Sequence, residues 1–190
     1  AKTTFLAASV VIVGASLSQG AISIGSLNSA VSQDFDVLAT TGSSTFVDDS
    51  TIAGWTVNSE EMDSNSNEYF ASSGTSTGGE VFSFGTGTDS DRALGYIGSG
   101  GNDFFNVAVG LQNNTGVTIS AINVSYTGEQ WRSGGNTSDN LNLLTFSYQI
   151  FSAGAGILPA STILTGWTTV SSLDFAAPQL SLAAGSLDGN

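Results

Sequence analysis

The chain has no cysteine and no histidine among its 190 residues. The absence of cysteine excludes a disulfide framework and a thiolate metal site. The absence of histidine excludes a Ser-His-Asp triad, a histidine-ligated zinc ion and an imidazole general base. A bound metal would therefore be a hard cation held by oxygen atoms, so calcium is the one cofactor that the composition leaves open.

Basic residues are almost as scarce. Lys2, Arg92 and Arg132 stand against sixteen acidic residues, which gives a formal net charge of −13. A surface of this sign repels phosphate groups, and two arginines cannot form the basic patch that a nucleic-acid interface needs. We therefore expect neither nucleic acid nor an anionic membrane surface among the partners of this domain.

Proline is also sparse, and sustained helical periodicity is missing. Only two prolines are present, and from residue 21 onward short apolar runs are separated by clusters of Gly, Ser, Thr and Asn. Such spacing is typical of a sandwich or barrel, and the length suits one domain. We predict an all-β fold, specifically an antiparallel jelly-roll-like β-sandwich preceded by a signal peptide.

The N-terminal residues have the pattern of a secretory leader. Lys2 precedes an apolar run over 5–17, and small residues follow it up to Gly20. The run is shorter than the roughly 20 residues that span a bilayer, although a membrane anchor or a first β-strand are the alternatives. We predict a signal peptide over 1–20, a single domain over 21–190 that is truncated at its C-terminal end, and no stable membrane span.

The longest alternating patterns flank one central segment. Apolar residues alternate with polar or small ones over 105–112 and again over 144–150, which is the period of a strand. Between them, 117–129 alternates in one parity and then slips by one residue, which predicts a bulge. We expect three long adjacent strands with 117–129 in the middle, entered by a turn at 113–116. The apolar positions of the middle strand are Val117, Ile119 and Ala121 before the slip and Ile122, Val124 and Tyr126 after it.

Other expected strands are shorter and are separated by polar loops. The apolar residues in them alternate over only a few positions, and an acidic turn at 89–91 opens one of them. The polar stretches 58–68 and 133–140 are expected to be loops. The shorter strands are expected at 33–38, 52–57, 81–84, 89–97, 167–170 and 180–182.

Each arginine follows acidic residues closely. Arg92 follows Asp89 and Asp91, and Arg132 follows Glu129 at a spacing of three. Where cations are so few, each is expected in a charge-assisted contact. Two interpretations are open: structural ion pairs of Asp91 with Arg92 and of Glu129 with Arg132, or a ligand site.

The ligand-site interpretation joins Glu129 and Arg132 to Trp131, whose ring would stack on a sugar if it were exposed. The alternative for tryptophan in a sandwich is the core. Asp89 and Asp91 resemble half of a calcium loop, and solvated surface acids are the alternative to a metal site. No carboxylate pair is singled out as a glycosidase would require, so we predict no catalytic residues and no enzymatic activity.

Several motifs also resemble those of secreted bacterial proteins that carry a C-terminal PEP-CTERM sorting signal. The resemblance implies an N-terminal β-sandwich, export and surface display, at times ahead of nuclease-like or other extracellular modules. This chain lacks the Pro-Glu-Pro signal, the apolar helix and the basic tail of that family, which agrees with truncation at Asn190. The motifs are Ala-Ile-Ser-Ile at 21–24, Thr-Ile-Ala-Gly-Trp at 51–55, Phe-Ser-Phe-Gly at 82–85, Asp-Arg-Ala-Leu-Gly at 91–95, Val-Ser-Tyr-Thr-Gly-Glu-Gln-Trp-Arg at 124–132 with Gly-Asn at 135–136, and Leu-Asp-Gly-Asn at 187–190.

The expected function is therefore that of a non-catalytic module of an exported protein, located outside the bacterial cell or on its surface, with a surface or matrix glycan as its partner. Two alternatives remain. The domain would be a self-associating structural subunit if an unpaired edge strand joins neighbouring copies. It would be an accessory domain if a larger extracellular enzyme, such as a nuclease, contains it.

Overall fold

The structure, a computed structural model, describes residues 7–13, 20–59, 67–98, 104–135, 142–152, 166–180 and 183–189. These residues form an all-β fold with several sheets and one short 3₁₀ helix, η1 (Ser171–Leu173). The all-β prediction is confirmed. Within the described ranges, no helix is long and apolar enough to cross a bilayer.

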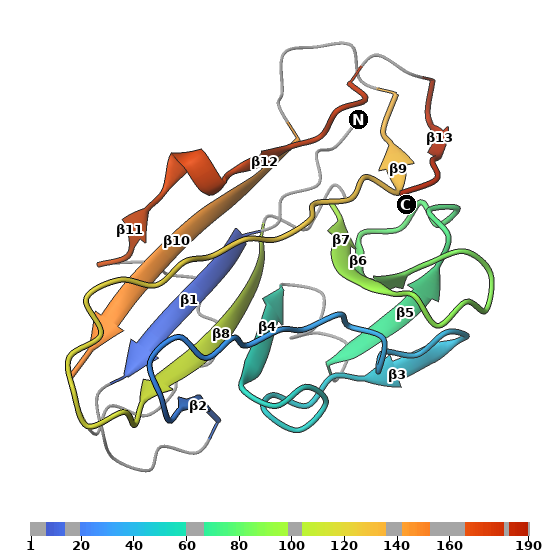
Figure 1. Cartoon of the computed structure of the whole chain (residues 1–190). Coiled ribbons are helices and arrows are strands. Elements are labelled where there is room, and N and C mark those ends of the chain that lie inside the picture. The colour runs from blue at the N-terminus through green and yellow to red at the C-terminus, as the bar shows by residue number, and fades with distance from the viewer. Residues whose placement is uncertain are drawn as a thin grey trace.

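The largest sheet is built on three long strands that lie side by side (Figure 1): β8 (Phe105–Asn113), β1 (Ala7–Val13) and β10 (Leu143–Phe151). β1 lies between the other two and is parallel to both. The far edge of β8 pairs with β4 and β2, and the far edge of β10 pairs with β11 and β12. These flanking strands are β4 (Trp55–Ser59), β2 (Ile22–Ile24), β11 (Thr168–Thr169) and β12 (Phe175–Ala176).

A second sheet has the order β3-β5-β6-β7, and a third consists of β9 and β13. β5 and β6 are parallel, whereas the other pairs in these two sheets are antiparallel. The strand arrangement is therefore mixed, with parallel pairs beside the antiparallel ones that the sequence predicts. The strands are β3 (Ser43–Thr45), β5 (Glu68–Ser72), β6 (Glu80–Phe84), β7 (Ala93–Ile97), β9 (Arg132–Ser133) and β13 (Gly185–Ser186).

The principal core joins the two larger sheets. The rings of Tyr96 on β7 and Phe105 on β8 are stacked, with centroids 5.3 Å apart, and both side chains are buried. Two sheets that share a core in this way are compatible with a sandwich. The buried apolar side chains of this core include Val57, Phe105 and Val107 from the large sheet and Tyr69, Val81, Leu94 and Tyr96 from the second sheet.

A second core covers the opposite face of the second sheet. The alternation of β6 directs Val81 into the principal core, whereas Phe82 and Phe84 join a cluster with Ile97 and Trp131. The Phe84 and Trp131 rings stack with centroids 6.1 Å apart. Trp131 thus helps to bury the outer face of this sheet.

β1 belongs to the segment that the sequence predicts to be a secretory leader. All seven of its residues are in register with both neighbours, at 106–112 of β8 and 145–151 of β10. A continuous apolar run suits the central strand of a parallel arrangement as well as it suits a signal peptide. The structure thus adopts the first-strand alternative, and removal of 1–20 on export stays a prediction.

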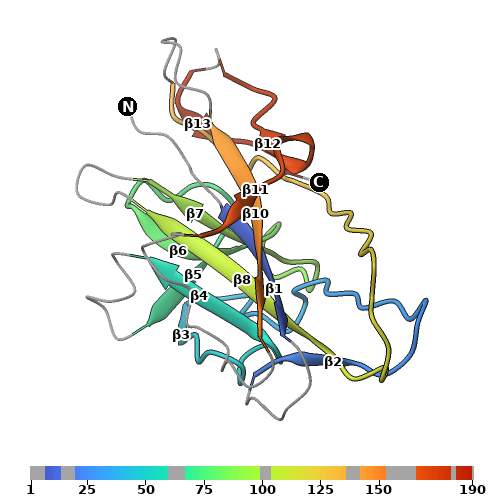
Figure 2. The same ribbon diagram turned by 90° about the vertical axis from the view of Figure 1, so that its left-hand side faces the viewer.

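The predicted middle strand over 117–129 is wrong for this structure. The described residues 114–131 contain no strand, and β1 holds the place between β8 and β10. The segment instead crosses one face of the large sheet toward β9 (Figures 1 and 2), where Ile122 and Val124 pack against Leu111 and Phe146. Alternation identifies a segment suited to a strand, but it does not decide which of two such segments occupies a given place.

The other predicted strands are confirmed in part. The long strands expected at 105–112 and 144–150 correspond to β8 and β10, and those ending at Phe84 and Ile97 correspond to β6 and β7. The strand expected at 33–38 is wrong, because Phe35 has a positive φ of 65° within a turn. Its ring contacts Trp55 edge to face at 5.0 Å, so an aromatic contact holds this turn. β5 lies where the sequence predicts no strand, because its first residue, Glu68, ends a polar stretch.

We predict that Gly54→Ala destabilises the fold strongly. Gly54 has a φ of +78°, and a Cβ there would lie 2.6 Å from Cγ1 of Ile22 on β2. Backbone strain and overlap together should cost about 2–3 kcal/mol, which lowers the melting temperature by about 4–12 °C in thermal circular dichroism.

Gly42→Ala is the matched control. Gly42 has a φ of +65°, but a Cβ there would meet nothing within 4 Å. Only the strain remains, so the loss should be about 1 kcal/mol. Equal losses in the two variants would show that the contact between Gly54 and Ile22 has no energetic weight.

Candidate functional site

One cavity of about 440 Å³ brings together the residues that the sequence singles out. Asp91, Arg92, Glu129, Trp131 and Arg132 all line it, although they come from distant parts of the chain. A larger groove of about 940 Å³ runs along residues 117–124, but no charged residue among those that the structure describes lines it. The smaller cavity is therefore the better candidate for a site that recognises polar chemistry.

Arg92 is held inside this region as a structural residue. Its side chain is only 3% exposed, and its Nε donates to Ser83 Oγ at 2.8 Å. Its Nη2 donates to the Ser83 carbonyl oxygen, and its Nη1 donates to that of Asp89 at 3.5 Å. Burial lowers the pKa of Arg92, while Asp89 and Asp91 oppose that change. The guanidinium thus acts mainly as a hydrogen-bond donor that joins β6 to the turn before β7.

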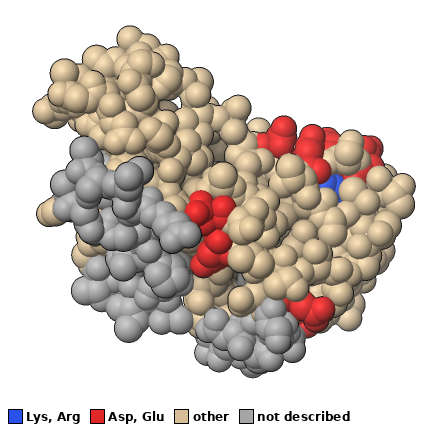
Figure 3. All heavy atoms as spheres, turned by 90° about the horizontal axis from the view of Figure 1, so that it is seen from below, with Lys and Arg blue, Asp and Glu red and all other residues tan. Residues whose placement is uncertain are grey.

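Asp89 and Asp91 lie in that turn, and both are exposed. The Asp91 backbone N–H donates to Asp89 Oδ1 at 3.4 Å. Among the described residues, no group of three acidic side chains is placed to hold a metal ion. Carboxylates appear in separate groups on the face in Figure 3. The nearby charge of Arg92 disfavours a cation at these two residues, and calcium binding stays a prediction.

Glu129 and Trp131 form a hydrogen bond with each other. The indole Nε1 of Trp131 donates to Glu129 Oε2 at 2.7 Å, and the Trp131 side chain is 5% exposed. Gly189 covers the indole, since a Cβ on that residue would lie 2.4 Å from Trp131 Cε2. Trp131 is therefore a core ring that orients Glu129, and its face is not free to stack on a sugar.

Arg132 has a different partner from the one that the sequence suggests. Its Nη1 donates to the Gly74 carbonyl oxygen at 2.9 Å, and an ion pair with Glu129 is not among the contacts of the described residues. The side chain is half-buried at the cavity wall. A guanidinium has five N–H donors, so one hydrogen bond does not exhaust its capacity to bind.

Three further groups line this cavity, and sequence reasoning missed two of them, Gln130 and Tyr126. Trp55 lines the wall, and its buried Nε1 has no hydrogen-bond partner among the described residues. Gln130 also lines it and is fixed by two bonds to the backbone of Gln179, from Nε2 to O at 2.9 Å and from N to Oε1 at 2.8 Å. Tyr126 donates to the Leu173 carbonyl oxygen, and burial together with Asp174 raises its pKa. No local pattern signals these contacts, because each joins segments far apart in sequence.

We predict that Arg92→Ala is much more destabilising than Arg132→Ala. Loss of Arg92 leaves buried acceptors on Ser83 unpaired and opens a void, at a cost of about 3–5 kcal/mol. The melting temperature should fall by about 6–20 °C. Arg132→Ala removes one half-buried hydrogen bond, so its loss should be about 1 kcal/mol. Similar melting temperatures for the two variants would contradict the structural role of Arg92.

Comparison with known proteins adds no identity to this site. No protein-family model, no curated protein sequence and no solved structure matches the chain.

Proposed function

We propose that the domain is a non-catalytic binding module of an exported protein, located outside the bacterial cell or on its surface, and that its 440 Å³ cavity takes a saccharide of a surface or matrix glycan. The observation that carries the proposal is the lining of this cavity. It combines the carboxylates of Asp91 and Glu129, the guanidinium of Arg132 and several aromatic rings within one concave surface.

A neutral saccharide suits such a lining because its hydroxyl groups both donate and accept hydrogen bonds. Carboxylate oxygens accept from two neighbouring hydroxyls, and the guanidinium fork donates to two oxygen atoms. The net charge of −13 disfavours an anionic ligand, which supports a neutral sugar over an acidic one.

Export and a jelly-roll-like topology are part of the same proposal. The apolar run that contains β1 follows Lys2 and ends in small residues, which supports a secretory leader. Two sheets that share a core support the sandwich architecture. Because the chain has no histidine and no cysteine, a binding role requires fewer assumptions than catalysis.

The site is different in detail from the one that the sequence suggests. Trp131 supports Glu129 from the core, so the ligand is expected to contact Glu129 and Arg132 directly and Trp131 only indirectly. Asp91 is an exposed rim residue, whereas Arg92 stabilises the wall from behind.

We predict that the full chain binds neutral glycans on an array and that Arg132→Gln and Asp91→Asn each weaken binding by about tenfold, which corresponds to about 1.4 kcal/mol. Glu68→Gln is the control, since Glu68 lies on β5 outside the cavity and its carboxylate contacts Ser43 at 3.4 Å. Melting curves would establish that all three variants remain folded.

Two results would contradict the proposal. One is a folded parent protein that binds no neutral glycan. The other is binding that Glu68→Gln weakens as much as Arg132→Gln does, because the cavity would then not be the site.

A further inference from the structure

β1 fills a slot one strand wide between β8 and β10. We propose that residues 117–126 take this slot in the exported protein and that the leader strand holds it only until the leader is removed. The proposal rests on the export part of the proposed function and is independent of the glycan part.

The direction of the flanking strands fits this exchange. β8 and β10 are both parallel to β1, so they run parallel to each other, about 9–10 Å apart. A segment that leaves the end of β8 and returns before β10 runs antiparallel to both. Residues 114–131 make this return, and in the structure they cross the face of the same sheet instead of entering it (Figures 1 and 2). Inserting 117–126 would give a simple antiparallel meander, which is the commonest way to join such strands.

The turn that such a hairpin needs is already formed. Asn113, the last residue of β8, donates from Nδ2 to the Val117 carbonyl oxygen at 2.8 Å. Thr115 Oγ1, which has one proton to donate, lies 2.7 Å from Asn113 Oδ1 and 3.0 Å from the same carbonyl oxygen. These bonds place Val117 beside Asn113 and set the first pair of the register.

Continuing that register matches apolar residues throughout. Side chains alternate between the two faces of a strand. In this register Val117, Ile119 and Ala121 would lie on the same face of the sheet as the odd-numbered residues of β8. The one-residue slip in the sequence then falls where a bulge would place two residues opposite Val109, and the second half of the segment regains the same face. The resulting pairs are Leu111 with Ile119, Val109 with Ala121 and Ile122 together, Val107 with Val124, and Phe105 with Tyr126.

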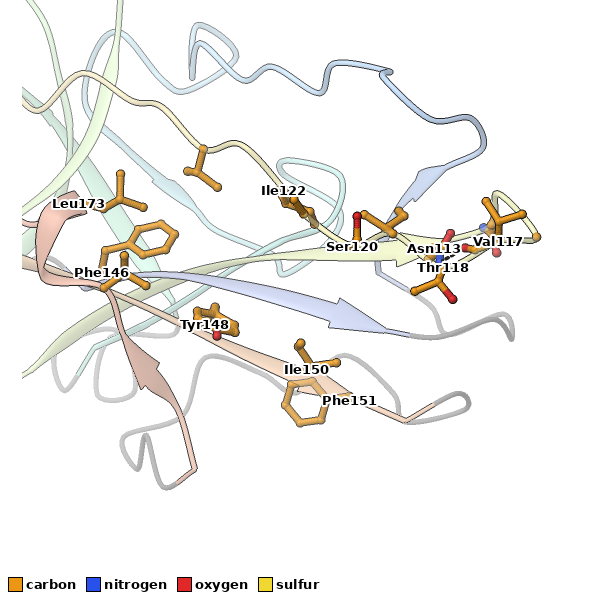
Figure 4. Close-up of a pocket in the computed structure, with 16 residues that line it drawn as sticks. Asn113, Val117, Thr118, Ser120, Ile122, Phe146, Tyr148, Ile150, Phe151 and Leu173 are labelled. Carbon is orange, nitrogen blue, oxygen red and sulfur yellow. Dashed lines mark hydrogen bonds between the residues drawn. The ribbon is translucent and has the colours of Figure 1, made fainter.

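In its present position the segment is incompletely packed. The groove of about 940 Å³ separates residues 117–124 from β10 and η1 (Figure 4), and it is lined by Phe146, Tyr148 and Ile150 among others. Ile150 is 68% exposed. The far end of the segment is already held at the sheet, because Tyr126 stacks on Phe146 with centroids 6.4 Å apart. Exchange would therefore move a short span between two fixed ends.

Cleavage of the leader supplies the driving force. While the leader is attached, both competing segments belong to one chain and have comparable effective concentrations. Once the leader is cut, its pairing with β8 and β10 becomes bimolecular, so it no longer has the effective concentration of about millimolar that a covalent link provides. Residues 117–126 remain linked to the sheet and keep that advantage. In the precursor the leader strand completes the sheet, and after processing residues 117–126 complete it instead. The leader also acts as a placeholder strand that protects the edges of β8 and β10 from other chains.

The test follows amide hydrogen exchange in the full chain that carries a specific protease site inserted between Gln19 and Gly20. Before cleavage, amides at 117–126 should exchange rapidly. After cleavage they should slow by at least about 100-fold, because they enter a central ladder. Amides of β6 and β7 should stay protected in both states and report that the fold persists.

A proline variant gives a matched comparison. Proline removes a donor and is not accepted in a central strand. Ile119→Pro should therefore lower the melting temperature by less than about 2 °C before cleavage and by more than about 5 °C after it. Val47→Pro is not a suitable control, because the Val47 N–H donates to Thr51 Oγ1. Val31→Pro is preferable, since Val31 is exposed and lies outside the strands.

Four results would overturn the proposal: rapid exchange at 117–126 after cleavage, loss of protection in β6 and β7, a cleaved leader that stays bound to the domain, or a dimer by light scattering whose slot is filled by a second copy. Glycan binding is measured separately on the same samples. A loss of glycan binding with protection at 117–126 intact would count against the proposed function alone.

Discussion

The structure depends on one constraint, which is that β8 must have hydrogen-bonding partners along both edges. β8 and β10 are the longest strands, with nine residues each. The side chains of β8 are largely buried, and Phe105 and Val107 belong to the principal core. Each buried backbone N–H or C=O group that lacks a partner lowers the stability of the fold by about the free energy of one lost hydrogen bond. β4 and β2 satisfy one edge, and β1 satisfies the other. The large sheet follows from this requirement, whereas its contact with the second sheet comes from the apolar side chains of the principal core.

Scarcity of charge shapes the second half of the architecture. Arg92 satisfies backbone acceptors inside the fold, while Arg132 donates to the Gly74 carbonyl oxygen at the wall of the cavity. Stacked aromatic rings connect the elements of this fold. The ring of Tyr96 on that of Phe105 joins the two larger sheets, and the ring of Phe84 on that of Trp131 covers the outer face of the second sheet. The result is a fold held together by apolar contacts in a chain with few charged residues.

One segment, residues 114–131, connects the slot between β8 and β10 with the cavity. Residues 114–131 start at the turn after β8, cross the large sheet, and end with Glu129 and Trp131 at the cavity wall. Tyr126 lies between the two and also lines the cavity. The same segment therefore connects the large sheet to the wall of the cavity.

The sequence by itself determined the class of fold and the two long strands β8 and β10. It also identified Arg92 and Arg132 as residues of interest, because basic residues are so few. Alternation, turn residues and composition are local properties, and they are read without knowledge of partners. Only the tertiary structure decided that Arg92 is a wall residue, that Trp131 is buried beside Glu129, and that residues 7–13 lie where 117–129 was expected. Each of these outcomes depends on competition between segments distant in sequence for the same neighbours. Local periodicity cannot rank such competitors, because their energies come from contacts that exist only after the chain has folded.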